Sequence, residues 1–178
     1  MKTSIALIGF MGTGKTVVGR LLAQKLRKDF VELDAEIEKK AGRSIPEIFR
    51  LDGEVRFREL EIEVVKDIST RKNAVIACGG GIVLNKINID RLKKKSVIIC
   101  LTALPSVILK RTAPDKNGRP LLDVADRARE IKKLLDFRRP FYTRSADIII
   151  NTSRLGIDSA AEKILETLKD YESNHRQK

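Results

Sequence analysis

Gly9-Phe-Met-Gly-Thr-Gly-Lys-Thr16 is the stretch of this chain that decides its fold. It matches the pattern G-x-x-x-x-G-K-[ST], in which glycines let the backbone curl so that successive N–H groups point at phosphate oxygens. A short apolar run at residues 5–9 predicts a buried strand before it, and an amphipathic run at residues 15–27 predicts a helix after it. Strand, loop and helix in this order indicate a nucleotide-binding P-loop.

The residues of the loop have separate tasks. The positive end of the following helix favours an anion, Lys15 can bridge the β- and γ-phosphates, and the hydroxyl of Thr16 can bind Mg²⁺. The residues that we expect around the phosphates of ATP are Gly12, Thr13, Gly14, Lys15, Thr16 and Val17.

Strands and helices alternate along the rest of the chain. Short apolar runs predict further strands at residues 30–33, 74–77, 97–101 and 147–150. Periodic apolar positions predict helices at residues 57–68, 105–111, 125–139 and 159–171, and Ser44-Ile-Pro-Glu47 has the capping-box pattern that opens another. This alternation indicates an α/β fold in which helices cover both faces of a parallel sheet.

Length and composition limit the class of protein. The 178 residues, of which 42% are hydrophobic and 34% charged, fit a single globular domain at residues 1–178. No apolar run approaches the roughly 20 residues of a membrane helix, and the start of the chain lacks the pattern of a signal peptide. We therefore expect a cytoplasmic protein without a membrane partner. Cys78 and Cys100 lie in apolar runs and are interpreted as buried thiols.

The charge of the chain predicts an anionic partner. Its net charge is +12, and residues 110–144 alone hold 11 Lys or Arg against 5 Asp or Glu. Nucleic acid, polyphosphates and small carboxylates are equally good candidates on charge alone. The sequence shows neither the aromatic signature of RNA-binding domains nor zinc-finger spacing, so we expect no nucleic-acid partner.

Three features favour phosphoryl transfer to a small molecule over a GTPase switch or a regulatory ATPase, which would share the loop. The chain is short and has no separate effector domain. Glu32 and Asp34 end the second predicted strand, at the edge where open α/β sheets bind ligands. Gly79-Gly80-Gly81 follows the third strand at the same edge, and three glycines let a ligand approach the backbone closely.

At about residues 4–170 the sequence resembles the shikimate kinases, a P-loop family related to nucleoside monophosphate kinases. The stretches that carry the resemblance are the P-loop, Asp34, Gly42-Arg-Ser-Ile-Pro-Glu-Ile-Phe49, Gly53-Glu54, Phe57-Arg58, Gly79-Gly-Gly81, Arg119-Pro-Leu-Leu122 and Arg138-Arg-Pro-Phe-Tyr142. The resemblance implies a three-layer α/β/α fold with a five-stranded parallel sheet, an acceptor-binding region near residues 34–62 and a lid near residues 112–124. It also implies transfer of the γ-phosphate of ATP to the 3-hydroxyl of shikimate, in the biosynthesis of chorismate and the aromatic amino acids.

The resemblance also implies which residues hold the acceptor. Arg58 and Arg138 match the family's carboxylate-binding arginines, and arginine suits a planar carboxylate better than lysine does. Asp34 matches the residue that orients the hydroxyl to be phosphorylated, and residues 79–81 match the turn that lies against shikimate, with Gly80 at its centre. Arg139, next in the chain, is the alternative to Arg138.

On the nucleotide side, Arg119 matches the lid arginine that closes over the phosphates, and Arg111 and Arg154 are similar to arginines that flank adenine. Lys15, Asp34 and Arg119 are accordingly the expected catalytic residues. Leu155 follows Arg154 where the family has a proline. Glu32 stands where the family has an aspartate, and we expect it to join Thr16 at Mg²⁺ through a water molecule.

Two alternatives stay open on the residues alone. Gluconate also carries a carboxylate, so a gluconate or nucleotide kinase of the same fold would share part of the pattern, although the triple glycine with Arg58 and Arg138 favours shikimate. The second alternative is a basic P-loop protein that binds nucleic acid or has a regulatory role. Our interpretation is a monomeric kinase that uses ATP and Mg²⁺ and has shikimate as its small-molecule partner.

Overall fold

A parallel sheet forms the centre of the computed structural model, which describes residues 2–113 and 124–176. The strands are β1 (Ser4–Ile8), β2 (Asp29–Glu32), β3 (Ala74–Ala77), β4 (Ser96–Thr102) and β5 (Ile148–Asn151). They lie in the order β2-β3-β1-β4-β5, and neighbouring strands run parallel. The five-stranded parallel sheet that the sequence led us to expect is confirmed.

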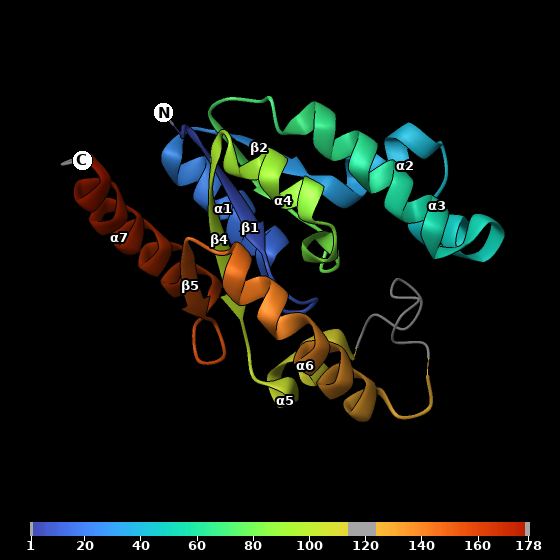
Figure 1. The fold of residues 1–178 in the computed structure, drawn as a ribbon. Coiled ribbons are helices and arrows are strands. Elements are labelled where there is room, and N and C mark those ends of the chain that lie inside the picture. Colours follow the sequence, from blue (N-terminus) through green and yellow to red (C-terminus); the bar gives the residue numbers. More distant parts are fainter. Residues whose placement is uncertain (1, 114–123, 177–178) are drawn as a thin grey trace.

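Helices cover both faces of this sheet, which gives the three layers expected of the fold (Figure 1). They are α1 (Lys15–Leu26), α2 (Leu33–Ala41), α3 (Ile45–Ile68), α4 (Lys86–Lys93), α5 (Pro105–Thr112), α6 (Arg127–Ser145) and α7 (Ile157–Arg176), with a 3₁₀ turn η1 (Ile82–Leu84) after β3. In Figure 1, α7 lies beside β5 at one end of the molecule, and α2 and α3 lie at the opposite end.

Alternating residues of β1, β3 and β4 fill two separate cores. In β1, Ile5 and Leu7 pack in the core that α1 and α7 cover, whereas Ala6 and Ile8 pack in the core under α3, α4 and α6. All four are buried. A strand that is covered on both sides needs apolar residues at every position, which explains why β1 appears in the sequence as a continuous apolar run.

The predicted capping box opens α3. The backbone N–H and the hydroxyl of Ser44 both donate to the Glu47 carboxylate, at 2.9 and 2.6 Å. Gly53 then takes a left-handed conformation, with φ of +79°, and divides α3 into two helical parts. The second part carries Phe57 and Arg58 over the end of the sheet.

A helix that our interpretation omitted follows β2. We expected the strand to reach residue 33, but it ends at Glu32 and α2 begins at Leu33. Leu33 and Ile37 are fully buried and lie one turn apart, so burial of this pair stabilises the helix. Asp34 consequently lies in the first turn of α2 rather than at the end of β2.

Helix α6 is longer than the sequence suggested. The predicted helix ended at Arg139, yet α6 continues through Pro140 to Ser145. A proline inside a helix removes one backbone hydrogen bond, and here Tyr142 and Ser145 beyond it are buried. The extension therefore places Tyr142 in the protein interior.

The expected lid at 112–124 lies almost wholly outside the described residues, because 114–123 fall there. Arg119 is among them. Thr112 ends α5 and is buried.

The close approach of β1 to β4 predicts that Gly9 cannot carry a side chain. Its φ is +136°, and an added β-carbon would collide with the carbonyl oxygen of Leu101. Gly9→Ala should lower the free energy of unfolding by about 2 kcal/mol or more. Gly156→Ala, where nothing lies within 4 Å of the added carbon, should cost less than about 1 kcal/mol. Urea unfolding of both variants measures the difference, and equal losses would contradict the steric explanation.

Candidate active site

The P-loop joins β1 to α1, and hydrogen bonds within the loop and to the end of β5 hold its backbone. Gly12 and Gly14 have φ of +75° and +97°, which glycine adopts without strain. The buried hydroxyl of Thr13 donates to the carbonyl of Phe10 at 2.7 Å, and the hydroxyl of Thr152, after β5, donates to the carbonyl of Thr13 at 2.9 Å. The side chain of Thr13 thus shapes the loop from inside.

Lys15 and Thr16 begin α1 beside the end of β2. The Lys15 ammonium donates to the carbonyl of Phe10 at 3.0 Å, and the Thr16 hydroxyl donates to Oε1 of Glu32 at 2.8 Å. A hydroxyl and a carboxylate are hard oxygen ligands of the kind that Mg²⁺ prefers, and Mg²⁺ keeps several of its waters. Thr16 and Glu32 therefore fit as the few protein ligands of an Mg²⁺ site.

A cleft of about 420 Å³ opens beside the P-loop. Its walls come from the P-loop, the end of β2 and start of α2, both parts of α3, the end of β3 with the turn after it, and α6. The expected site residues that line it are Gly12, Gly14, Lys15, Thr16, Val17, Glu32, Asp34, Arg58, Gly79, Gly80, Gly81 and Arg138. The structure thus brings the expected phosphate-binding and acceptor-binding residues into one cavity.

Two of the three glycines after β3 lack side chains at positions where charged groups of the cleft lie. A β-carbon on Gly79 would lie 2.9 Å from Oδ1 of Asp34, and one on Gly81 would collide with the guanidinium of Arg58. Any larger residue at either position would therefore displace one of these two groups. This steric requirement explains glycine at positions 79 and 81 more specifically than the need for a flexible turn does.

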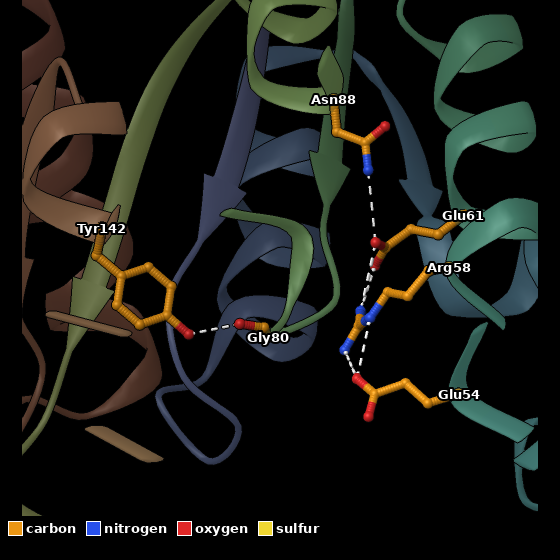
Figure 2. Close-up of polar contacts among 6 residues, drawn as sticks. All are labelled: Glu54, Arg58, Glu61, Gly80, Asn88 and Tyr142. Atoms are coloured by element: carbon orange, nitrogen blue, oxygen red, sulfur yellow. Dashed lines mark hydrogen bonds and ion pairs between the residues drawn. The ribbon is translucent and has the colours of Figure 1, made fainter. Parts of the chain in front are cut away.

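Arg58 is held between two carboxylates (Figure 2). It donates to Oε1 of Glu54 at 2.8 and 3.2 Å and to the two oxygens of Glu61 at 3.2 and 3.3 Å. Asn88 of α4 donates to Glu61 from the other side at 3.4 Å. Because two carboxylates contact the guanidinium on different sides, its orientation in the cleft is restricted.

Arg138 and Arg139, which the sequence did not separate, differ in the structure. Arg138 is 3% exposed, lines the cleft and lies 5.7 Å from the ring centroid of Phe10. Its Nε has no hydrogen-bond partner among the residues that the structure describes. Arg139 is exposed on the surface, where it pairs with Asp136 at 3.1 Å. Only Arg138 is therefore placed to bind a ligand in this cleft.

Burial raises the pKa of Asp34 above its ordinary value, and the nearby charges of Lys15 and Arg58 oppose that shift. The carboxyl group lies in the cleft with Lys15. A carboxylate with a raised pKa is a better proton acceptor than an exposed one.

Glu61 is a fully buried carboxyl group. Burial raises its pKa from 4.5 to about 7, against the opposing effect of Arg58. Asp34 raises the pKa of Glu61 further. The same burial that orients Arg58 thus makes the charged form of Glu61 costly.

Arg111 and Arg154, the residues expected beside the adenine, do not line the cleft. Arg111 at the end of α5 donates to the carbonyl of Gly12 at 3.3 Å and to Thr152 at 2.8 and 3.1 Å, so it bridges the P-loop and the end of β5. Arg154 is exposed in the loop before α7, and Arg119 lies outside the described residues.

Several cleft residues were missed from the sequence. Phe49, Phe57 and Glu61 line the cleft, and Tyr142 donates a hydrogen bond to the carbonyl of Gly80. Glu61 could have been found, because it follows Arg58 by three residues on a predicted helix and so lies on the same face. Tyr142 ends one of the stretches that carry the family resemblance, but its contact with Gly80 depends on a helix that passes through Pro140, which the sequence did not predict.

Comparison with known proteins identifies the family. A family model described as shikimate kinase matches residues 11–169. A shikimate kinase of Thermodesulfovibrio yellowstonii is 50% identical over 169 residues, which are 95% of each chain. The solved shikimate kinase of Acinetobacter baumannii in complex with shikimate is 39% identical with a TM-score of 0.91, over 96% of this chain and 94% of that one. A gluconokinase of Sinorhizobium meliloti, 15% identical with a TM-score of 0.59 over 99% of both chains, shares the fold alone.

The burial of Glu61 predicts a pH-dependent stability. Because its pKa is higher in the folded protein than in the unfolded chain, the protonated form adds stability that is present below about pH 4.5 and lost as the pH rises towards 7. Relative to Glu61→Gln, the wild-type protein should therefore lose free energy of unfolding between pH 4.5 and pH 7.5. Urea titrations across this range measure it.

Glu59→Gln is the control for this prediction, because Glu59 lies on the same helix and is 56% exposed. It should keep the wild-type slope. A difference between wild type and Glu61→Gln that does not change with pH would show that the ionisation of Glu61 is not linked to folding.

Proposed function

The chain belongs to the shikimate kinase family, and we propose how its own residues carry out transfer of the γ-phosphate of ATP to the 3-hydroxyl of shikimate, a step of the shikimate pathway. The observation that carries the proposal is the single cleft in which Lys15 and Thr16 face Asp34, Arg58 and Arg138. The phosphate-binding groups and the two arginines there suit the anionic groups of the two substrates, and the carboxylate of Asp34 suits the hydroxyls of shikimate.

The acceptor is held at its two ends. In this proposal the guanidinium groups of Arg58 and Arg138 bind the carboxylate of shikimate, and Asp34 binds its hydroxyls. The turn at residues 79–81 lies against the ring, where glycine leaves room for it. Support comes from the lining of the cleft, in which residues 79–81 lie together with Asp34, Arg58 and Arg138.

The nucleotide is held by the P-loop. The backbone N–H groups around Gly12 and Gly14, with the start of α1 and Lys15, would bind the β- and γ-phosphates. Arg111 and Arg154 would flank the adenine, and Arg119 would approach the γ-phosphate from the segment that the structure does not describe. The hydrogen bond from Arg111 to the carbonyl of Gly12 supports a role for Arg111 on the nucleotide side of the cleft.

We assign Thr16 and Glu32 to a bound Mg²⁺ ion, with water molecules completing its ligands, on the strength of their 2.8 Å contact. When bound, the ion neutralises charge on the phosphates.

The transfer itself needs positioning more than covalent chemistry. The 3-hydroxyl oxygen of shikimate attacks the γ-phosphorus in line, the bond from that phosphorus to the β,γ-bridging oxygen breaks, and ADP leaves. Asp34 orients the hydroxyl and takes its proton, a role that suits its raised pKa. Lys15 and Arg119 offset the charge on the moving phosphoryl group.

The remaining parts of the proposal concern the molecule as a whole. We propose a monomer that works in the cytoplasm as one kinase domain, with an acceptor-binding region near residues 34–62, a lid near 112–124 and no nucleic-acid partner. Within residues 2–113 and 124–176, no helix is both long and apolar enough to cross a membrane.

Replacing Lys15 by Ala tests the nucleotide side. The change removes the cation beside the transferred phosphate, and turnover should fall by about 10²-fold or more, as for other preorganised charge contacts. The fold should be kept, because Lys15 belongs to neither of the two apolar cores. Steady-state ADP release and circular dichroism measure both. A folded variant with the wild-type rate would exclude this role.

Replacing Arg138 by Lys tests the acceptor side. The variant keeps the charge but loses the planar two-point contact with a carboxylate, so shikimate binding should weaken by about 1.5–3 kcal/mol. ATP affinity should change little. Arg139→Lys is the matched control, since Arg139 lies on the surface, and it should bind shikimate as the wild type does. Calorimetric titration decides between them, and intact shikimate binding by Arg138→Lys would show that this arginine does not hold the acceptor.

A further inference from the structure

Tyr142 makes a contact that the proposed mechanism does not use. Its side chain is 6% exposed, and its hydroxyl donates to the carbonyl of Gly80 at 2.5 Å (Figure 2). Burial raises the pKa of the phenol, so the group stays a protonated donor. The contact joins α6 to the turn after β3, two elements that are 62 residues apart in the sequence.

The turn needs this contact more than an ordinary turn would. Three successive glycines have no side chains to restrict their backbone. The carbonyl of Gly79 accepts from the N–H of Ile82 at 3.2 Å, and the carbonyl of Gly81 accepts from the N–H of Leu84 at 3.0 Å. These two bonds are local. The carbonyl of Gly80, between them, is held by Tyr142 from another element.

Fixing that carbonyl also fixes the N–H of the next residue. The peptide between Gly80 and Gly81 is planar and trans, so its C=O and N–H point in opposite directions. Figure 2 shows Tyr142 and Arg58 on opposite sides of Gly80. With the carbonyl directed at Tyr142, the N–H of Gly81 is directed away from it, on the side where Arg58 packs against Gly81.

Tyr142 also shares a helix with Arg138, which the proposed function places at the acceptor. Arg138 and Tyr142 are four residues apart on α6, and both are buried, so they lie on one face of the helix. The same helix face thus supplies an arginine to the cleft and a tether to the glycine turn. A change in the position of α6 would alter two of the groups that face the acceptor.

We propose that Tyr142 is a positioning residue of the acceptor site. It holds the Gly80–Gly81 peptide in one orientation and keeps it in register with Arg138. The inference rests on the proposed function, because it assumes that the acceptor lies between this turn, Arg58 and Arg138. A tyrosine that only fills the core would stabilise the protein without favouring one substrate.

Tyr142→Phe tests the inference, since it removes the hydroxyl and keeps the ring. The KM for shikimate should rise roughly five- to tenfold, the effect of one lost buried hydrogen bond, while the KM for ATP stays within about twofold. Tyr171→Phe makes the same chemical change in α7, on the other face of the sheet, and should leave both constants unchanged. A folded Tyr142→Phe with the wild-type KM for shikimate would overturn the inference, and so would an equal rise for both substrates.

A second measurement applies even where Tyr142→Phe folds poorly. The chain has two tyrosines, so protein made with 3-fluorotyrosine gives two ¹⁹F signals, and Tyr171→Phe assigns them. Adding shikimate should shift the signal of residue 142 and leave that of residue 171 in place, whereas an unmoved signal at residue 142 would contradict a role at the acceptor. If the wild type phosphorylates no shikimate at all, the proposed function has failed before any variant is compared.

Discussion

The site depends on one constraint, that the carboxyl ends of three parallel strands meet at the same edge of the sheet. β1 leads into the P-loop, β2 into Glu32 and Asp34, and β3 into the glycine turn. Because β1 lies between β3 and β4, the P-loop has the ends of β2 and β3 on one side and the ends of β4 and β5 on the other. The strand order thus places Glu32 and the glycine turn on one side of the P-loop and Thr152 on the other.

Near this edge of the sheet, charged side chains are buried. Arg58 is paired with Glu61, a fully buried carboxyl, and Arg138 is itself almost fully buried. Burial of such groups costs stability unless partners are well placed. The two carboxylates that pair with Arg58 restrict the orientation of its guanidinium in the cleft. The glycines at 79 and 81 belong to the same arrangement, since they leave the space in which Asp34 and Arg58 lie.

Local patterns in the sequence were enough to predict the sheet, the P-loop and the helix that Ser44 opens, because each depends on neighbouring residues. The resemblance to one family placed Asp34, Arg58, the glycine turn and Arg138 together, and they line one cleft. The errors have a common cause. Helix α2 and the far end of α6 are stabilised by burial of Ile37 and Tyr142 against distant elements, which overrides the local signals of a strand end and a proline. The hydrogen bond from Asn88 to Glu61, the partner of Arg58, is likewise a tertiary contact.

The most direct measurement is ADP release from the wild-type protein with MgATP and, separately, shikimate, gluconate and nucleoside monophosphates, with the product identified by ³¹P NMR. The account predicts that shikimate stimulates ADP release far more than the others and that the phosphate is found on the 3-hydroxyl, in a one-to-one ratio with ADP. Faster ADP release with gluconate or a nucleotide, or ADP release with shikimate that leaves shikimate unphosphorylated, would contradict it.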